Sequence, residues 1–147
     1  MTRTGAQIAE QLQAAGVASL NWHLADRDYA LPTLNFLRRA FASALWSFQN
    51  FFAVLSWTEE ANDCDDFARI SAGFAQILHY LTPDRPDRSA LAVGEFWYQK
   101  DNFGGGHAIN VACCGPEPSD VVFYEPQTRT VVHLSDTEKA NATMVRF

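Results

Sequence analysis

Hydrophobic positions in the first part of the chain recur at the spacing of an α-helix. Residues 7–15 form a short amphipathic segment, and a longer apolar stripe runs from Thr33, a suitable N-cap, to about residue 57. A third helical stripe covers residues 63–80 and stops before a proline. The pattern predicts a helical part over about residues 1–82.

Beyond about residue 90, the pattern changes to the shorter period of strands. The strand-like runs cover residues 90–99, 107–114, 121–125, 130–134 and 143–147, the last of them an expected edge strand. The first four pair into two hairpins, whereas the proline-containing segments 26–33 and 82–87 are expected to be connections. Helices followed by antiparallel strands indicate an α+β fold, with one domain over residues 1–147 and its sheet part over about 90–147.

Residues 40–57 carry no formal charge over 18 positions, which is the lower limit for a membrane-spanning helix. Polar side chains are scattered through the segment, and its apolar residues form one stripe rather than covering every face. The pattern favours a buried amphipathic helix over a membrane span.

The chain has 147 residues, 48% of them hydrophobic and 13% aromatic, which is ample for one core. The net charge of −6 and the absence of a Lys/Arg cluster argue against nucleic acid as a partner. The three cysteines make a poor disulfide framework, and the N-terminal residues do not resemble a signal peptide. A cytoplasmic location is therefore the default expectation.

The segment Asn62–Phe67 carries the most informative chemistry, because Cys64 falls where a helix begins. A helix start favours a thiolate and offers free backbone N–H groups. His107 follows three glycines at the start of a strand, and Glu125 ends the next strand. Together they supply a nucleophile, a base and a carboxylate that orients the base. Gln127 is an alternative or supporting residue.

Each of these residues also has a structural explanation. Cys64 fits a buried packing cysteine, His107 fits a residue beside a hairpin turn, and Glu125 fits a solvated strand end. The flanking carboxylates oppose a thiolate, because like charge raises the pKa of a thiol. These carboxylates are Glu59, Glu60, Asp63, Asp65 and Asp66. They are expected either to cap the helix or to bind a cation such as Ca²⁺.

At these motifs the chain resembles the papain-like and transglutaminase-like cysteine enzymes. It is most similar to the C-terminal protease domain of the fungal Marasmius oreades agglutinin and to related small bacterial or phage proteins. The resemblance covers about residues 62–128, with 43 residues from Cys64 to His107 and 18 from His107 to Glu125. It implies a papain-like fold, a Cys-His-Glu triad and dependence on calcium, with Asp65 and Asp66 as ligand positions.

Of three functions considered, the first is the favoured one and the other two are alternatives. The first is a cysteine-dependent hydrolase or acyltransferase that acts on peptide or protein amide bonds through Cys64. The second is a cell-wall amidase or endopeptidase of the NlpC/P60 type, which also has Asp-Cys near a helix start. The third is a catalytically silent module that binds a partner protein. A zinc site is excluded by spacing, because the adjacent pair Cys113-Cys114 has no second Cys/His pair, and these two residues are expected to pack within a strand.

Overall fold

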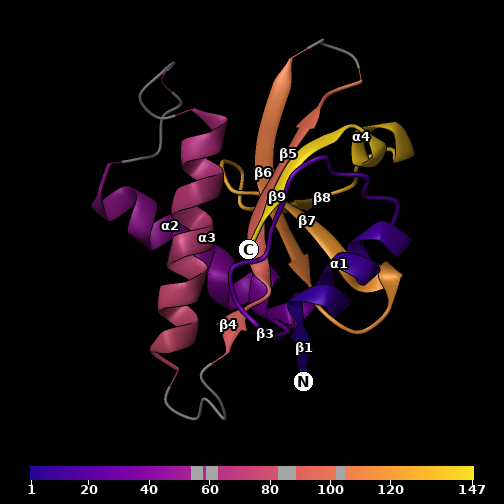
Figure 1. Ribbon diagram of the computed structural model, residues 1–147. Helices are drawn as coiled ribbons and strands as arrows, with labels where there is room; N and C mark the ends of the chain where they lie inside the picture. The colour runs from indigo at the N-terminus through magenta and orange to yellow at the C-terminus, as the bar shows by residue number, and fades with distance from the viewer. Residues whose placement is uncertain (54–57, 59–62, 83–88, 102–104) are drawn as a thin grey trace.

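The computed structural model describes residues 1–53, 58, 63–82, 89–101 and 105–147 (Figure 1). The larger of its two sheets has six strands. These are β2 (Trp22–His23), β5 (Val93–Gln99), β6 (Gly106–Cys113), β7 (Val121–Glu125), β8 (Thr130–Val132) and β9 (Ala142–Arg146). Their order is β2-β9-β5-β6-β7-β8. The expected hairpins are present as the antiparallel pairs β5–β6 and β7–β8, but β9 lies inside the sheet, between β2 and β5, and not at its edge.

A smaller sheet is made of β1 (Thr2–Thr4), β3 (Asp28–Ala30) and β4 (Ala90–Leu91). β1 pairs antiparallel with β3, and β3 pairs parallel with β4. The expected connection at residues 26–33 thus contains a strand. These strands have two or three residues each, too short to show the alternation by which a strand is recognised in sequence.

The helices lie on both faces of the six-stranded sheet, as Figure 1 shows. They are α1 (Gly5–Ala14), the π-helix η1 (Phe36–Phe41), α2 (Ala42–Phe51), α3 (Cys64–Tyr80), the 3-10 helix η2 (Pro118–Asp120) and α4 (Asp136–Ala140). α3 packs on β5 and β6. The expected helix from Thr33 is therefore divided into η1 and α2, and its last predicted turn lies outside the described residues.

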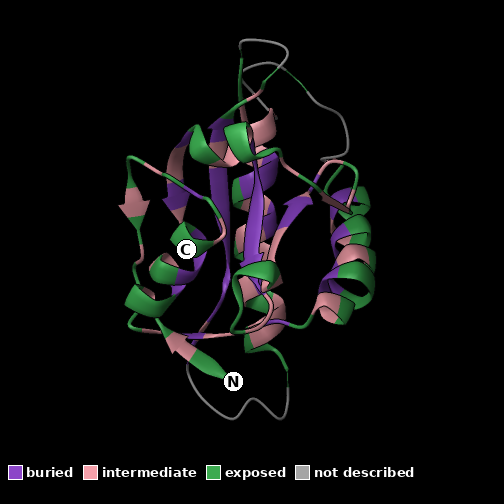
Figure 2. Ribbon diagram, turned by 90° about the vertical axis from the view of Figure 1, so that its right-hand side faces the viewer, coloured by how far each residue is buried: buried purple, intermediate pink, exposed green. Residues whose placement is uncertain are grey.

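Two buried clusters lie on opposite faces of the six-stranded sheet, since neighbouring residues of a strand point to opposite sides. One packs Ile8 and Leu12 of α1 against Phe96 and Ile109. The other, which includes Leu45 of α2, packs the helices η1, α2 and α3 against the sheet. Figure 2 shows the buried residues running through the central strands.

The expected papain-like or transglutaminase-like α+β fold, with N-terminal helices on an antiparallel sheet, is contradicted. Strands begin at Thr2, two parallel strand pairs occur, and β-sheet rather than helix forms the centre of the molecule. The error came from reading the first 82 residues by helical period alone, which passes over strands of two or three residues. None of the helices within the described residues combines the length and the apolar character that crossing a bilayer requires.

Candidate functional site

A groove of about 260 Å³ lies between the start of α3 and the β5–β6 hairpin. Cys64, the first residue of α3, lines it together with His107 of β6. Trp97 and Tyr98 of β5 add aromatic surface to its wall. In Figure 1 the start of α3, the end of β5 and the start of β6 lie at the same end of the molecule. The structure therefore brings Cys64 and His107 to one concave site.

The His107 ring is held by two neighbours. Its Nε2 atom lies 2.8 Å from Oε2 of Glu125, and both side chains are largely buried. With Glu125 ionised, Nε2 donates and Nδ1 keeps the free lone pair, so the carboxylate fixes the tautomer. Tyr98, directly opposite on β5, packs against the imidazole with the ring centroids 5.8 Å apart. The pKa of Tyr98 is raised, mainly by burial and then by the nearby charges of Glu138, Glu125 and Cys64. Its hydroxyl therefore stays protonated.

Glu125 is itself held from the turn that follows β7. Its Oε1 atom accepts the backbone N–H of Gln127 at 3.1 Å. The buried Gln49 of α2 donates to the carbonyl oxygen of Pro126 and accepts from Arg129. Gln127 therefore contacts Glu125 through its backbone N–H. The contacts of Gln49 connect α2 to the turn that carries Gln127.

Cys64 owes its position to the packing of α3. The fully buried Asn110 of β6 donates through Nδ2 to the carbonyl oxygens of Ala68, 2.8 Å away, and of Gly94, 3.1 Å away. The Ser71 hydroxyl donates to Oδ1 of Asn110. This network ties α3 to β5 and β6 within a turn or two of Cys64, so helix and hairpin keep a fixed separation.

Asp63, Asp65 and Asp66 lie together at the start of α3, with one oxygen of each within 4.8 Å of the others. Asp63 is the N-cap residue but makes no side-chain capping bond. A hydrogen bond with Asp63 raises the pKa of Asp65 and lowers that of Asp63. Arg69 pairs with both Asp65 and Asp66, so part of the negative charge is balanced within the helix. Capping by Asn62 lies outside the described residues, and binding of Ca²⁺ at Asp65 and Asp66 stays a prediction.

The other two cysteines are remote from this groove. Burial raises the pKa of Cys113 and of Cys114 to about 12 each. Sequence reasoning missed Trp97, Tyr98 and Thr143, which also line the groove. The β5–β6 register would have identified Tyr98, since it faces His107 across the hairpin.

No protein-family model matches the chain, and neither does any curated protein sequence. Two solved structures are similar over 99% of the chain at 26% identity. One is a complex of PSL1a with E64, with a TM-score of 0.74, of which the chain covers 51%. The other is Polyporus squamosus lectin bound to the human-type influenza-binding epitope Neu5Acα2-6Galβ1-4GlcNAc, with a TM-score of 0.69 and 49% covered. The chain thus spans about half the length of either neighbour.

These comparisons contradict the resemblance to papain-like and transglutaminase-like cysteine enzymes, because the named neighbour is a lectin. They also contradict the expected cysteine peptidase. The broader assignment as a hydrolase or acyltransferase, which includes the amidase alternative, is contradicted as well. The non-catalytic binding module agrees better with a lectin neighbour. The physical reason for the error is that three short motifs show only which types of side chain are present. A cysteine, a histidine and a glutamate can bind a ligand as well as catalyse a reaction.

Proposed function

We propose that this chain is a non-catalytic binding module with carbohydrate as its ligand class. The groove at the start of α3 is its binding site. The observation that carries the proposal is the composition of this groove, where the aromatic residues Trp97 and Tyr98 stand beside hydrogen-bonding groups. Ligand sites typically combine aromatic surface with a few convergent polar groups.

We assign the polar end of the site to Cys64, His107 and Glu125. The ring nitrogen of His107 that Glu125 leaves free accepts a hydrogen bond from a sugar hydroxyl, and the partly buried Glu125 holds the ring in place. Asp65, beside Cys64 in the groove, offers a carboxylate acceptor, and Gln127 supports Glu125 through its backbone. A lectin neighbour that binds a glycan supports this ligand class.

The charge of the groove favours a neutral sugar. Asp63 and Asp65 line it, and Glu125 lies behind His107. A sialic acid carboxylate would meet like charge there, at a cost of about 1 kcal/mol or more per close pair. We therefore expect Galβ1-4GlcNAc to bind more tightly than its sialylated form.

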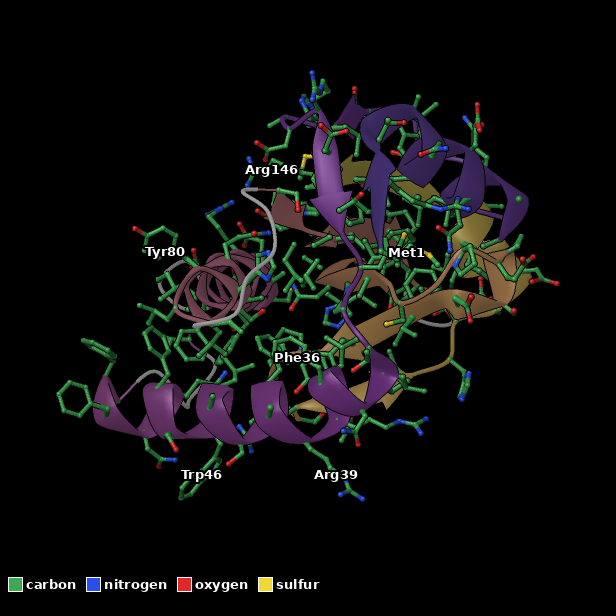
Figure 3. The ribbon with its side chains drawn as sticks, turned by 90° about the horizontal axis from the view of Figure 1, so that it is seen from below. Met1, Phe36, Arg39, Trp46, Tyr80 and Arg146 are labelled. Atoms are coloured by element: carbon green, nitrogen blue, oxygen red, sulfur yellow. The ribbon has the colours of Figure 1, made fainter. Side chains whose placement is uncertain are left out.

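Titration of the 15N-labelled chain with Galβ1-4GlcNAc, followed by NMR, tests the proposal. We expect shifts at the groove residues and loss of binding by about tenfold or more in Trp97→Ala and His107→Ala. Trp46→Ala is the matched control, because Trp46 lies on α2 and its side chain points away from the body of the molecule (Figure 3). Unchanged groove signals at millimolar sugar would overturn the carbohydrate assignment.

The non-catalytic part of the proposal needs its own measurement. Casein and a fluorogenic peptide library are incubated with the wild-type chain and with Cys64→Ser, with and without Ca²⁺. We expect no turnover above the Cys64→Ser background. Turnover by the wild type alone, or a covalent E64 adduct at Cys64 that abolishes turnover, would contradict the proposal.

A further inference from the structure

A second groove, of about 460 Å³, runs beside β8 and is larger than the one at Cys64. β8 is the last strand in the order of the six-stranded sheet, and β7 is its partner. No strand of the described residues covers the other side of β8. The edge of β8 therefore presents backbone donors and acceptors that are available for a further strand.

The walls of this groove combine apolar side chains with polar groups. Leu34, just before η1, lines it together with Val121 and Phe123 of β7 and with Val132 and Leu134. The volume lies within the range of about 300–1,000 Å³ that is usual for ligand sites. Alternate side chains of an extended segment placed along β8 would meet this apolar surface.

The ionisable side chains of this groove are all basic. Arg38 of η1, His133 after β8 and Lys139 of α4 line it, and no Asp or Glu does. This is a local exception in a chain with a net charge of −6. Lys139, whose side chain is 20% exposed, pairs with Asp136, whose side chain is 99% exposed, so a carboxylate of a bound segment would have to replace Asp136 in this pair.

We propose that the groove beside β8 binds an extended acidic segment of a partner protein, which adds to the six-stranded sheet as a strand. The backbone edge of β8 supplies the main-chain hydrogen bonds. The apolar walls take the side chains on one face of the segment, and Arg38, His133 and Lys139 pair with its carboxylates. Nucleic acid fits less well, because three basic groups on an acidic protein cannot follow a phosphate backbone.

The test is fluorescence anisotropy with a short fluorescein-labelled peptide of alternating Glu and Val. We expect it to bind the wild-type chain with an affinity that falls as salt is added. Arg38→Glu should weaken binding by about tenfold or more, since it replaces attraction by repulsion inside the groove. Arg39→Glu is the matched control. It makes the same change of charge on the neighbouring residue, whose side chain points away from the molecule in Figure 3, and should change affinity by less than about twofold.

Two further measurements distinguish a partner segment from other possible ligands of the groove. A peptide that is N-methylated at every residue cannot donate a backbone hydrogen bond from either of its edges, and we expect it not to bind. Equal binding of the methylated peptide, equal effects of Arg38→Glu and Arg39→Glu, or no binding of the parent peptide would each overturn the proposal. A self-associated chain in sedimentation velocity, made monomeric by Arg38→Glu, would assign the groove to a second copy instead.

Discussion

At the scale of single residues, the groove at Cys64 is defined by groups whose neighbours leave them little freedom. Glu125 accepts from the His107 ring and from the backbone of Gln127, so both of its oxygens are engaged. Tyr98 packs against the imidazole ring in an edge-on arrangement. A ring held in this way keeps one nitrogen directed to Glu125, and the site is preorganised before any ligand arrives.

The three cysteines should differ in reactivity. Cys64 is partly exposed in the groove at a helix start, whereas burial raises the pKa of Cys113 and Cys114 to about 12. At pH 8 only about one in ten thousand of the latter two would be thiolate. Iodoacetamide at pH 8, followed by peptide mass spectrometry, should modify Cys64 well before the other two. Labelling of Cys113 and Cys114 should accelerate as the pH rises toward 12, because the pKa shift is upward.

A companion variant checks the part played by His107 in this reactivity. His107→Ala should slow alkylation of Cys64 and leave the rates of Cys113 and Cys114 unchanged, since those residues are remote from the ring. The same slow alkylation rate for all three thiols in the wild type would show that the groove does not increase the reactivity of Cys64.

At the scale of elements, the approach of β9 to β5 depends on the absence of a side chain at one position of β5. A Cβ atom at Gly94 of β5 would collide with the backbone carbonyl of Arg146 and lie 2.9 Å from the Phe147 ring. Gly73, in the middle of α3, has nothing within 4 Å of such an atom. The close approach of β9 to β5 therefore depends on Gly94, whereas Gly73 is replaceable.

Alanine at these two glycines should act in opposite directions. Gly94→Ala should lower the free energy of unfolding by about 3 kcal/mol or more, because backbone must move to admit the methyl group. Gly73→Ala should raise it by up to about 1 kcal/mol, since alanine is the better helix former. Urea denaturation followed by circular dichroism measures both. A loss of stability in Gly73→Ala, or a change below about 1 kcal/mol in Gly94→Ala, would contradict the packing described.

Sequence patterns identified the elements with a strong period and missed those without one. The strand pattern of β5, β6 and β7 and the helical stripe of α3 were sufficient to predict these elements. They have seven, eight, five and seventeen residues, respectively, which is long enough for each to show its own period. β1, β2 and β3 have three, two and three residues, and their pairing depends on partners far along the chain. Likewise, the motifs located Cys64, His107 and Glu125, but the wall formed by Trp97 and Tyr98 follows from the hairpin register alone.

At the scale of the whole molecule, one sheet separates two cores. Ile8 of α1 is fully buried on one face and Leu45 of α2 on the other. The strands β5 and β6 contribute to both, with Phe96 and Ile109 in the first cluster and Val93 and Ala112 in the second. Neither core can lose its packing without exposing one face of the shared strands, which favours a single cooperative unit over residues 1–147.

This arrangement predicts how stability responds to a cavity in either core. Ile8→Ala and Leu45→Ala should each lower the free energy of unfolding by about 2–5 kcal/mol, because both side chains are completely buried. At about 2–4 °C per kcal/mol, each variant should melt at least about 4 °C below the wild type. Calorimetry should show one transition in every case, coincident with those seen by circular dichroism and tryptophan fluorescence. Two resolved transitions, each moved by only one of the substitutions, would instead mean that the N-terminal segment and the helical layer fold as separate units. The groove at Cys64 could then lose its α3 wall while the sheet stayed intact.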